Sequence, residues 1–373
     1  MKILHLIDNF DARFERDQIK LVELLEKRGY DVTVVTSRYS SDERLAKKSE
    51  FKSWEKRFSQ AKILHTPSLR IHTPFSFDPA IAYVPSIRIW QDYDIVHAYT
   101  FGAYSSLLAS VVKIVRNPKM VLRSDLSLSA YNKAKNAPFY RMILTYPFKI
   151  ADAVYVYSNL EKHYIVGLGV QENKVWTIPV GIDSDKFSKN SIGQKDESIT
   201  VGYLGRFCFV KGIHRIVPVL RTILRTEKKV RVAFTGMLED MEYANSVMTS
   251  LKKYRNFGYL GNLSTSPLRF YNICDIILVP SISETGATIV LEAMASGRVV
   301  IASNINPIND YIEHERTGFL FNKQKEVYVY IKKLIEDPNL IREIGRRARK
   351  EAAKYDWNLI IRRYEEMYRS VIK

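Results

Sequence analysis

The sequence lacks the patterns that would mark several classes of protein. Cys208 and Cys274 are its only cysteines, and no cysteine or histidine cluster with metal-ligand spacing accompanies them, so a disulfide framework is excluded and no metal site is indicated. No apolar run approaches the roughly 18 residues that a membrane-spanning helix needs. The opening MKILHLIDNF meets an acidic residue too early for a signal peptide and predicts a β-strand instead. We therefore expect a cytoplasmic protein that is soluble or rests on the cytoplasmic face of a membrane.

Acidic residues are scarce relative to basic ones. The 373 residues include 57 Lys and Arg against 40 Asp and Glu, a formal charge of +17. Residues 38–70 hold nine basic and four acidic groups, and residues 323–373 hold fourteen and eight. This balance favours anionic partners, namely phosphates, acidic lipid headgroups or nucleic acid, although solvated helix faces explain either segment equally well.

Short β-branched runs alternate with longer helical patterns from end to end. The predicted strands form two series, at 2–7, 31–36, 94–98, 119–123, 153–157 and 174–178, and then at 199–204, 230–235, 256–260, 275–280 and 299–302. Helical patterns fall between them, for example at 15–28, 103–115, 210–225 and 287–296. Such alternation predicts an α/β fold with parallel sheets covered by crossover helices.

The two series are separated by a polar stretch rich in Ser, Asp, Lys and Gly. It divides the chain into predicted domains at 1–183 and 199–355, joined by a linker at 184–198. Residues 356–373 carry apolar side chains at helical spacing, which predicts an amphipathic C-terminal helix. Substrates are expected in the crevice between the domains, at the carboxyl ends of the strands.

The strongest local pattern is SISETGATIVLEAMASG, residues 281–297. A polar loop with Glu284 follows a predicted strand, and a helix that opens after Gly286 contains Glu292. The N-terminus of a helix presents free N–H groups and the positive end of a dipole, which suit a phosphate or sugar hydroxyls. The two carboxylates can accept hydrogen bonds from two sets of hydroxyls on one extended ligand. Taken alone, Glu292 would be an ordinary helix residue.

A second pattern, VGYLGRFCFVKGIHRI at residues 201–216, joins a predicted strand to a helix. Gly205 permits close backbone approach, and Arg206 and Lys211 flank the turn; paired cations there suit a diphosphate. The loop has neither the Gly-Lys-Ser/Thr ending of a Walker loop nor the Gly-x-Gly-x-x-Gly fingerprint. By itself it identifies no ligand.

Together, the two patterns resemble those of the family 4 retaining glycosyltransferases of GT-B fold. The matching stretches cover most of the C-terminal domain and lie at 179–187, 205–212, 275–281, 284–297 and 317–320. The resemblance implies two Rossmann-like parallel-sheet domains that face a central cleft, with the C-terminal helix crossing back to the first domain. The first domain would carry the acceptor, and the second would bind the nucleotide-sugar donor.

The resemblance also implies roles for single residues. Arg206 and Lys211, beside Gly205, would contact the donor diphosphate, and Glu292 would hold the ribose hydroxyls. Glu284 would hold the donor sugar together with the backbone amides of Gly286, Ala287 and Thr288. Neither a metal nor another cofactor is expected, because the two cations would neutralise the departing diphosphate. Asp183-Ser184-Asp185 looks like the Asp-x-Asp metal motif of other glycosyltransferases, but its place in the linker favours a structural role.

The N-terminal half departs from the family pattern. The loop after the first strand reads DNFDAR at residues 8–13 where the family has a Gly-Gly pair, which puts its part in the site in doubt. Ser124 stands where a histidine is common, so Asp125 is the candidate for orienting or deprotonating an acceptor hydroxyl. A helix-capping aspartate explains Asp125 about as well. His97 matches another family position, where it would line the cleft or, with comparable weight, be a satisfied half-buried histidine.

The expected activity is hexosyl transfer from a nucleotide-diphosphate sugar to a glycan, lipid-linked or small-molecule hydroxyl acceptor, with retention. Two rivals stay open: a sugar-nucleotide epimerase, which would need no acceptor, and a basic nucleic-acid-binding protein, disfavoured because no nucleic-acid module is recognisable. Aromatic residues interleave with the basic residues of 38–70 and predict an amphipathic surface for an anionic membrane. The aromatic residues concerned are Phe51, Trp54 and Phe58, with Phe139, Tyr140, Tyr146 and Phe148 as additions.

Overall fold

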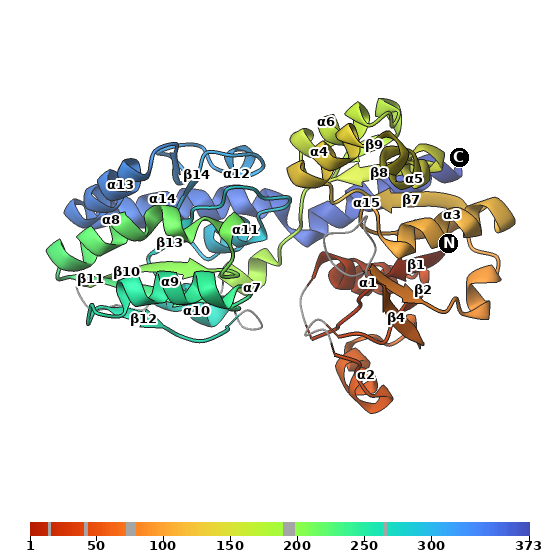
Figure 1. Cartoon of the computed structure of the whole chain (residues 1–373), viewed down its shortest axis with the longest axis horizontal. Coiled ribbons are helices and arrows are strands. Elements are labelled where there is room, and N and C mark those ends of the chain that lie inside the picture. The colour runs from red at the N-terminus through yellow and green to blue at the C-terminus, as the bar shows by residue number, and fades with distance from the viewer. Residues whose placement is uncertain (14–15, 41–43, 72–79, 189–197, 264–266) are drawn as a thin grey trace. The chain divides into compact units, whose positions relative to one another are not determined.

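The computed structural model describes residues 1–373 except 14–15, 41–43, 72–79, 189–197 and 264–266. The chain forms two compact units, coloured in sequence order in Figure 1. Unit 1 comprises Met1–Pro179 and Ile360–Lys373, and unit 2 comprises Val180–Leu359.

Unit 1 is built on a parallel sheet in the order β3-β2-β1-β6-β7-β8-β9. Its interior strands are buried on both faces, as the nearly continuous apolar runs predicted. The strands are β1 (Lys2–Ile7), β2 (Asp31–Ser37), β3 (Lys62–Thr66), β6 (Ile95–Ala98), β7 (Lys119–Arg123), β8 (Ala153–Val156) and β9 (Val175–Thr177), with a separate antiparallel pair of β4 (Ser68–Ile71) and β5 (Ala80–Tyr83). The helices are α1 (Asp17–Lys27), α2 (Lys48–Trp54), α3 (Tyr104–Arg116), α4 (Leu128–Asn136), α5 (Pro138–Ile150) and α6 (Asn159–Gly167).

Unit 2 repeats this plan with a parallel sheet in the order β12-β11-β10-β13-β14-β15. Its strands are β10 (Ile199–Leu204), β11 (Val230–Thr235), β12 (Phe257–Tyr259), β13 (Ile276–Val279), β14 (Val299–Ser303) and β15 (Phe319–Phe321). Its helices are α7 (Ser184–Ser188), α8 (Ile213–Thr226), α9 (Met241–Leu251), α10 (Pro267–Ile273), α11 (Thr288–Ala295), α12 (Ile308–Tyr311), α13 (Gln324–Glu336) and α14 (Pro338–Ala352).

The last helix, α15 (Trp357–Ile372), returns the chain to unit 1. Its apolar stripe is buried, with Tyr364 and Tyr368 each at most 1% exposed. The Glu365 carboxylate accepts hydrogen bonds from Arg28 and from the Tyr30 hydroxyl, each at 3.1 Å. The C-terminal helix is therefore a structural part of unit 1, although its first three residues belong to unit 2.

The boundaries of the units differ slightly from those expected from composition. Unit 2 begins at Val180, and the first part of the expected linker forms the short helix α7. Ile182 explains the early start, because its N–H donates to the Tyr355 carbonyl and its own carbonyl accepts from Trp357, both at 2.9 Å. Residues 189–197 of the expected linker lie outside the described residues.

Of the aromatic residues of the basic segment 38–70, Phe51 is buried, whereas Trp54 and Phe58 are half-buried. Phe51 is 3% exposed and stacks on His65 with ring centroids 3.6 Å apart. Phe58 packs against Phe10, and the guanidinium of Arg13 covers Trp54 at 4.1 Å from the ring centroid. The predicted amphipathic surface therefore keeps Trp54 and Phe58 partly accessible but loses Phe51 to the interior.

The additional aromatic residues expected on that surface differ in the same way. On α5, Phe139 and Tyr146 are 66% and 47% exposed, whereas Phe148 is fully buried. The side chain of Tyr140 lies outside the described part of the chain.

Candidate functional site

The sheet order in unit 2 creates a topological switch point at β10. The chain leaves β10 towards β11 on one side and later returns to β13 on the other, so the loops that follow β10 and β13 lie side by side. In open α/β sheets this is where ligands bind, because diverging connections leave a crevice at the carboxyl ends of the strands. These loops, 205–212 and 280–287, contain most of the donor-site residues predicted from the sequence.

Backbone contacts hold the two loops together. The Ile282 N–H donates to the Val210 carbonyl at 2.8 Å. Gly212 adopts a left-handed conformation with φ of 66°, and a Cβ at this position would lie 2.1 Å from the Pro280 carbonyl oxygen. Only glycine fits there without moving the backbone of the neighbouring loop. The Lys211-Gly212 pair therefore sets the separation of the loops as well as providing a charge.

Lys211 and Glu284, predicted from separate patterns, form an ion pair across the loops. The Lys211 Nζ lies 2.7 Å from Glu284 Oε1, and the Ser281 hydroxyl donates to the same oxygen at 2.6 Å. The two charged side chains are only 16% and 10% exposed, so their attraction is weakly screened. The structure thus brings together a cation and a carboxylate that lie 73 residues apart in the sequence.

Arg206 lies in the same loop but points to a different partner. Its guanidinium donates to Glu239 at 2.6 Å, and its side chain is 51% exposed. The Tyr203 hydroxyl donates to the Arg206 carbonyl at 2.8 Å and so fixes the backbone after Gly205. Neither contact was predicted from the sequence: Glu239 lies outside both patterns, and Tyr203 reads there as an apolar strand residue.

Glu292 lies on α11, which begins directly after the second loop. Its Oε2 accepts a hydrogen bond of 2.8 Å from the hydroxyl of Tyr271, which is fully buried. Thr288 is the first residue of the helix, and the residue before it, Ala287, is left-handed with φ of 46°. The Val290 N–H donates to the Ala287 carbonyl at 2.9 Å, and the carbonyl of Gly286 accepts from Tyr311 at 3.2 Å. The pairing of Tyr271 with Glu292 had no signal in the sequence.

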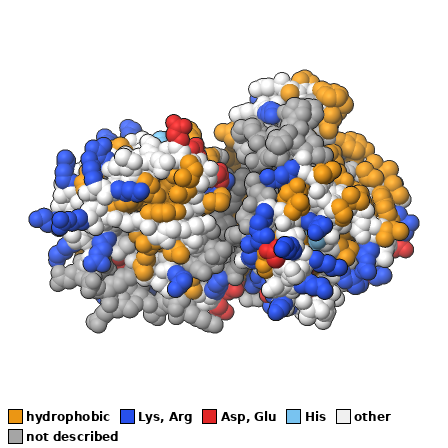
Figure 2. Space-filling model, turned by 60° about the horizontal axis from the view of Figure 1, so that its bottom comes forward, with side chains coloured by type: hydrophobic (Ala, Val, Ile, Leu, Met, Phe, Trp, Pro, Cys, Tyr) orange, Lys and Arg blue, Asp and Glu red, His pale blue; other side chains and the backbone are white. Residues whose placement is uncertain are grey.

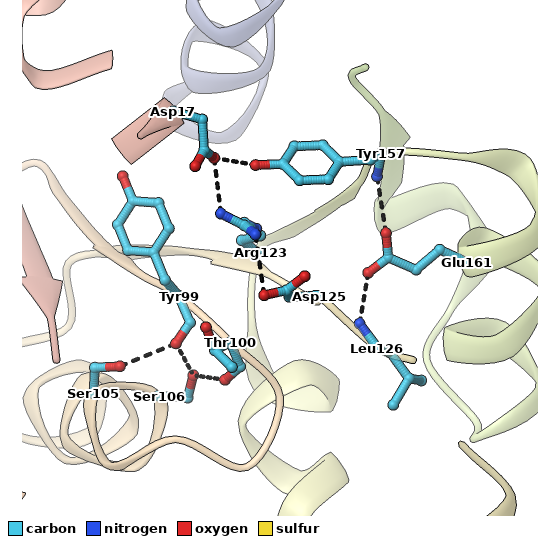
Figure 3. Close-up of polar contacts among 10 residues, drawn as sticks. All are labelled: Asp17, Tyr99, Thr100, Ser105, Ser106, Arg123, Asp125, Leu126, Tyr157 and Glu161. Atoms are coloured by element: carbon cyan, nitrogen blue, oxygen red, sulfur yellow. Dashed lines mark hydrogen bonds and ion pairs between the residues drawn. The ribbon is translucent and has the colours of Figure 1, made fainter. Parts of the chain in front are cut away.

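In unit 1, Asp125 belongs to a buried network of charges, shown in Figure 3. Arg123 lies 3.0 Å from Asp125 and 2.8 Å from Asp17, and its side chain is 8% exposed. The Tyr157 hydroxyl donates to the same Asp17 carboxylate. Asp125 itself has φ of 51° and a side chain that is 27% exposed. Asp125 is therefore a partly exposed carboxylate held in place by an ion pair with the buried Arg123.

Glu161 completes the network and was not identified from the sequence. Its two carboxylate oxygens accept the N–H groups of Leu126 at 2.8 Å and Tyr157 at 2.9 Å. Burial raises the pKa of Glu161 to about 7, an effect that the negative charge of Asp125 reinforces. This carboxylate fixes the loop after β7 and the end of β8, and therefore the position of Asp125.

His97 lies inside unit 1, and nothing of its side chain is exposed to solvent. Its Nδ1 makes a 2.7 Å hydrogen bond with the Tyr368 hydroxyl of α15, and its ring lies 4.8 Å from that of His5. Burial, followed by the nearby charges of His5 and Arg123, lowers its pKa well below the usual value. His97 is therefore a neutral core histidine that helps to attach the C-terminal helix, rather than a residue that lines a cleft.

Asp8 is a further candidate that the sequence pattern did not single out. It follows β1, which occupies the switch point of the unit 1 sheet between β2 and β6. Its Oδ1 accepts a hydrogen bond of 3.1 Å from the Ser105 N–H at the start of α3. Burial raises the pKa of Asp8 to about 7, although its hydrogen bonds to Ser105 oppose the shift. A carboxyl that titrates near neutrality at such a position is suited to proton transfer.

Two features that bear on function are absent from the described part of the chain. Its His, Cys, Asp and Glu side chains nowhere gather in threes that could hold a metal ion. Asp183 accepts the Lys186 N–H at 3.2 Å at the start of α7, which is the structural role expected for the Asp-Ser-Asp stretch. Across these same residues, every helix is too short or too polar to cross a membrane.

Comparison with known protein families gives a match in each half of the chain. Residues 184–351 match the model described as "Glycosyl transferases group 1", and residues 18–186 match "Glycosyltransferase Family 4". Together the two models cover nearly all of both predicted domains.

Related proteins and structures point in the same direction. The capsular polysaccharide biosynthesis glycosyltransferase CapM of Staphylococcus aureus is 27% identical over 61% of this chain and 63% of its own length. The N,N'-diacetylbacillosaminyl-diphospho-undecaprenol alpha-1,3-N-acetylgalactosaminyltransferase of Campylobacter jejuni is 28% identical over 61% and 62%. Each match thus spans less than two thirds of the relative. The crystal structure of Anabaena Alr3699/HepE in complex with UDP and glucose superposes with a TM-score of 0.73 at 17% identity, covering 99% of this chain and 100% of that one. This likeness confirms the predicted fold of two Rossmann-like domains.

Proposed function

We propose that this chain, which belongs to the family 4 glycosyltransferases of GT-B fold, is a retaining enzyme. It would move a sugar from a nucleotide-diphosphate donor to a hydroxyl acceptor with retention of anomeric configuration. The observation that carries the proposal is the Lys211–Glu284 pair on the two loops at the switch point of unit 2. A charged ligand bound at these two loops would contact a cation, a carboxylate and the N-terminus of α11.

Each group at this site has a role that follows from its chemistry. Lys211 and Arg206 would bind the donor diphosphate, since cations stabilise the charge that develops on a leaving phosphate. Glu292, held by Tyr271, would accept hydrogen bonds from the ribose hydroxyls. Glu284 and the amides of residues 286–288 would hold the sugar. The two cations would also replace a divalent metal, so that donor binding and transfer would be metal-independent.

The chemical step exchanges one bond at the anomeric carbon for another. The bond from this carbon to the diphosphate oxygen breaks, the acceptor oxygen forms the new bond on the same face, and the acceptor proton passes to the departing diphosphate. Lys211 and Arg206 would make the diphosphate a better leaving group, worth about a hundredfold or more in rate for each group. In unit 1, Asp125 and Asp8 are the candidates for orienting the acceptor hydroxyl.

The acceptor proposed here is a glycan attached to a lipid diphosphate or a growing polysaccharide. The names of two relatives, one for capsular polysaccharide biosynthesis and one for a diphospho-undecaprenol acceptor, support this class.

The test is a transfer assay with a panel of nucleotide sugars and lipid-linked or soluble acceptors, in the presence of a chelator, with the product anomer read by NMR. We expect nucleoside diphosphate release that depends on the acceptor and a product of unchanged anomeric configuration. An inverted product would refute retention, and loss of transfer on chelation would refute metal independence. Conversion of the donor without any acceptor would instead identify a sugar-nucleotide epimerase. Selective binding of an RNA or DNA, with no donor turnover, would point to the nucleic-acid alternative.

A further inference from the structure

The turn between α11 and β14 in unit 2 contains a buried arginine. Arg298 immediately precedes β14, and only 1% of it is exposed. Its Nε and Nη1 are buried, and neither has a hydrogen-bond partner in the part of the chain that the structure describes. Figure 2 shows other Lys and Arg side chains at the surface, where water solvates them. Arginine is almost never fully buried unless it is paired, so Arg298 marks a place where an acceptor is missing.

Two neighbouring residues have unused donors as well. Ser296 is 1% exposed, and its hydroxyl is buried without a partner among the described residues. The same holds for the Nε of Arg349, which belongs to α14. The Nη2 of Arg349 donates to the Ser296 carbonyl at 3.4 Å, so the side chain is anchored beside the turn. We call Ser296, Arg298 and Arg349 the Arg298 cluster.

Two glycines bring the members of the Arg298 cluster together. Gly297 is left-handed with φ of 69°, and a Cβ there would lie 2.7 Å from the Nη2 and 3.3 Å from the Nε of Arg349. A Cβ on Gly345, one turn earlier in α14, would lie 2.2 Å from the Gly297 carbonyl oxygen. Because neither position has a side chain, α14 approaches the turn closely, and the guanidinium of Arg349 lies against the backbone between Ser296 and Arg298.

The charges in the Arg298 cluster are only partly compensated. Burial lowers the pKa of Arg298, the negative charge of Asp275 opposes this shift, and the positive charge of Arg349 adds to it. The Oδ2 of Asp275 accepts the Thr200 N–H at 2.8 Å, so this carboxylate also serves the backbone of β10. The C-terminal end of α11 attracts cations through its dipole. This attraction explains why a cation lies here, but it gives the unpartnered donors no acceptor.

We infer that the Arg298 cluster binds a small oxyanion of the phosphate or sulfate type. The planar donors of a guanidinium group match the oxygens of such anions, and the serine hydroxyl adds another donor. Water would satisfy these donors but would leave the buried positive charge uncompensated, which is costly in a protein interior. Arg349 is half-buried, so the cluster is in contact with solvent through this residue.

The Arg298 cluster is separate from the proposed donor site. The donor loop 280–287 follows β13, whereas Arg298 precedes β14, which is parallel to β13. The two sites therefore lie at opposite edges of the unit 2 sheet. The inference does not depend on the proposed function, since a phosphate ion bound here would contact none of the donor-site residues.

The experiment is thermal unfolding of the full chain with increasing inorganic phosphate, compared with chloride at equal pH and ionic strength. The test variant is Arg298→Met, which removes the charge and keeps a long side chain. The matched control is Arg342→Met, at an exposed arginine of α14. Because phosphate would also bind Lys211, wild type, test variant and control are each measured with and without Lys211→Met. A nucleotide thermal shift verifies that the donor site is intact in Arg298→Met.

We expect phosphate to raise the melting temperature of the wild type and the control, with and without Lys211→Met, by mass action. Arg298→Met should weaken the apparent Kd of phosphate at least tenfold. In chloride, it should melt at the same temperature as the wild type or higher, because it removes a buried charge that lacks a full set of partners. The order of stability should therefore reverse when phosphate is added.

Three results would overturn the inference: no effect of phosphate beyond that of chloride, an equal effect in Arg298→Met, or loss of the effect with Lys211→Met alone. A lower melting temperature of Arg298→Met in both salts, with an unchanged phosphate effect, would identify Arg298 as a structural cation instead. Glycerol 3-phosphate distinguishes the source of the anion. Stabilisation by phosphate alone would assign the cluster to the free ion, and stabilisation by both would assign it to the phosphate group of a larger molecule. A normal nucleotide shift without a phosphate effect would leave the donor site standing and overturn only the anion site.

Discussion

Lys211 and Glu284 form an ion pair, but we predict that they bind different parts of the donor, so that substitutions at the two positions have different effects. If Lys211 binds the diphosphate and Glu284 the sugar, Lys211→Met should weaken binding of the free nucleoside diphosphate. A charge-assisted hydrogen bond contributes about 1.5–3 kcal/mol, which corresponds to an increase in Kd of roughly ten- to a hundredfold. Glu284→Gln should leave this Kd within about threefold of wild type or lower it, because the ammonium group loses its competing internal partner.

Turnover should respond differently from binding. Glu284→Gln removes a charged acceptor for the sugar hydroxyls, so kcat/KM of transfer should fall about ten- to a hundredfold even though diphosphate binding persists. Calorimetric titration with the nucleoside diphosphate and steady-state transfer kinetics measure the two effects. The double variant should bind the diphosphate as Lys211→Met does. If Glu284→Gln weakens binding of the nucleoside diphosphate as much as Lys211→Met does, the pair acts as one structural unit and the division of roles is wrong.

Three further predictions test the surroundings of the site. Gly212→Ala should lower the melting temperature and the donor affinity together. An alanine in the left-handed conformation costs about 1–2 kcal/mol of stability, and its Cβ would displace the opposite loop. The neutral control is Gly258→Ala, whose Cβ meets no atom within 4 Å. Tyr271→Phe should raise the Kd of the nucleotide about three- to tenfold, because Glu292 loses the hydroxyl that fixes it; an unchanged Kd would contradict the ribose assignment. Glu161→Gln should flatten the pH dependence of stability. Because folding raises the pKa of Glu161 from 4.5 to about 7, the free energy of unfolding of the wild type should fall by up to about 3 kcal/mol as the pH rises between these values. An equal pH dependence of thermal unfolding in the variant would refute the assignment.

The sequence predicted the architecture well because buried parallel strands have a simple signature. β7, β10 and β11 span the residues predicted for them, because most of their side chains are buried between the covering helices. β3, at the edge of the unit 1 sheet, was missed because its side chains are mostly half-exposed and mixed in character. Edge strands carry weaker hydrophobic patterns than central ones.

The donor site could be predicted only in part, for a related reason. Arg206, Lys211, Glu284 and Glu292 stand in recognisable motifs, but their immediate partners do not. Tyr271 is an ordinary core tyrosine until the fold brings its hydroxyl to Glu292, 21 residues away in sequence. Contacts of this kind depend on packing between helices, which no local pattern encodes.

In unit 1, local patterns were less informative still. His97 and Asp125 were both chosen by position, and the structure gives them opposite surroundings. His97 is sealed in the core by α15, while Asp125 lies beside a buried arginine that is also paired with Asp17. Burial decides between a structural and a chemical role, and burial of a single polar side chain is a property of the whole fold.

The most direct test of the donor site is thermal unfolding of the full chain with UDP, GDP and ADP in turn, in the presence of a chelator. Specific binding stabilises the native state by mass action, by about 2.7 kcal/mol at a concentration a hundredfold above Kd. We predict that one of the three nucleotides raises the melting temperature of the wild type, and that Glu292→Ala abolishes the increase. An absence of any shift, or an equal shift in Glu292→Ala, would contradict the assignment of this crevice as a nucleotide-sugar site.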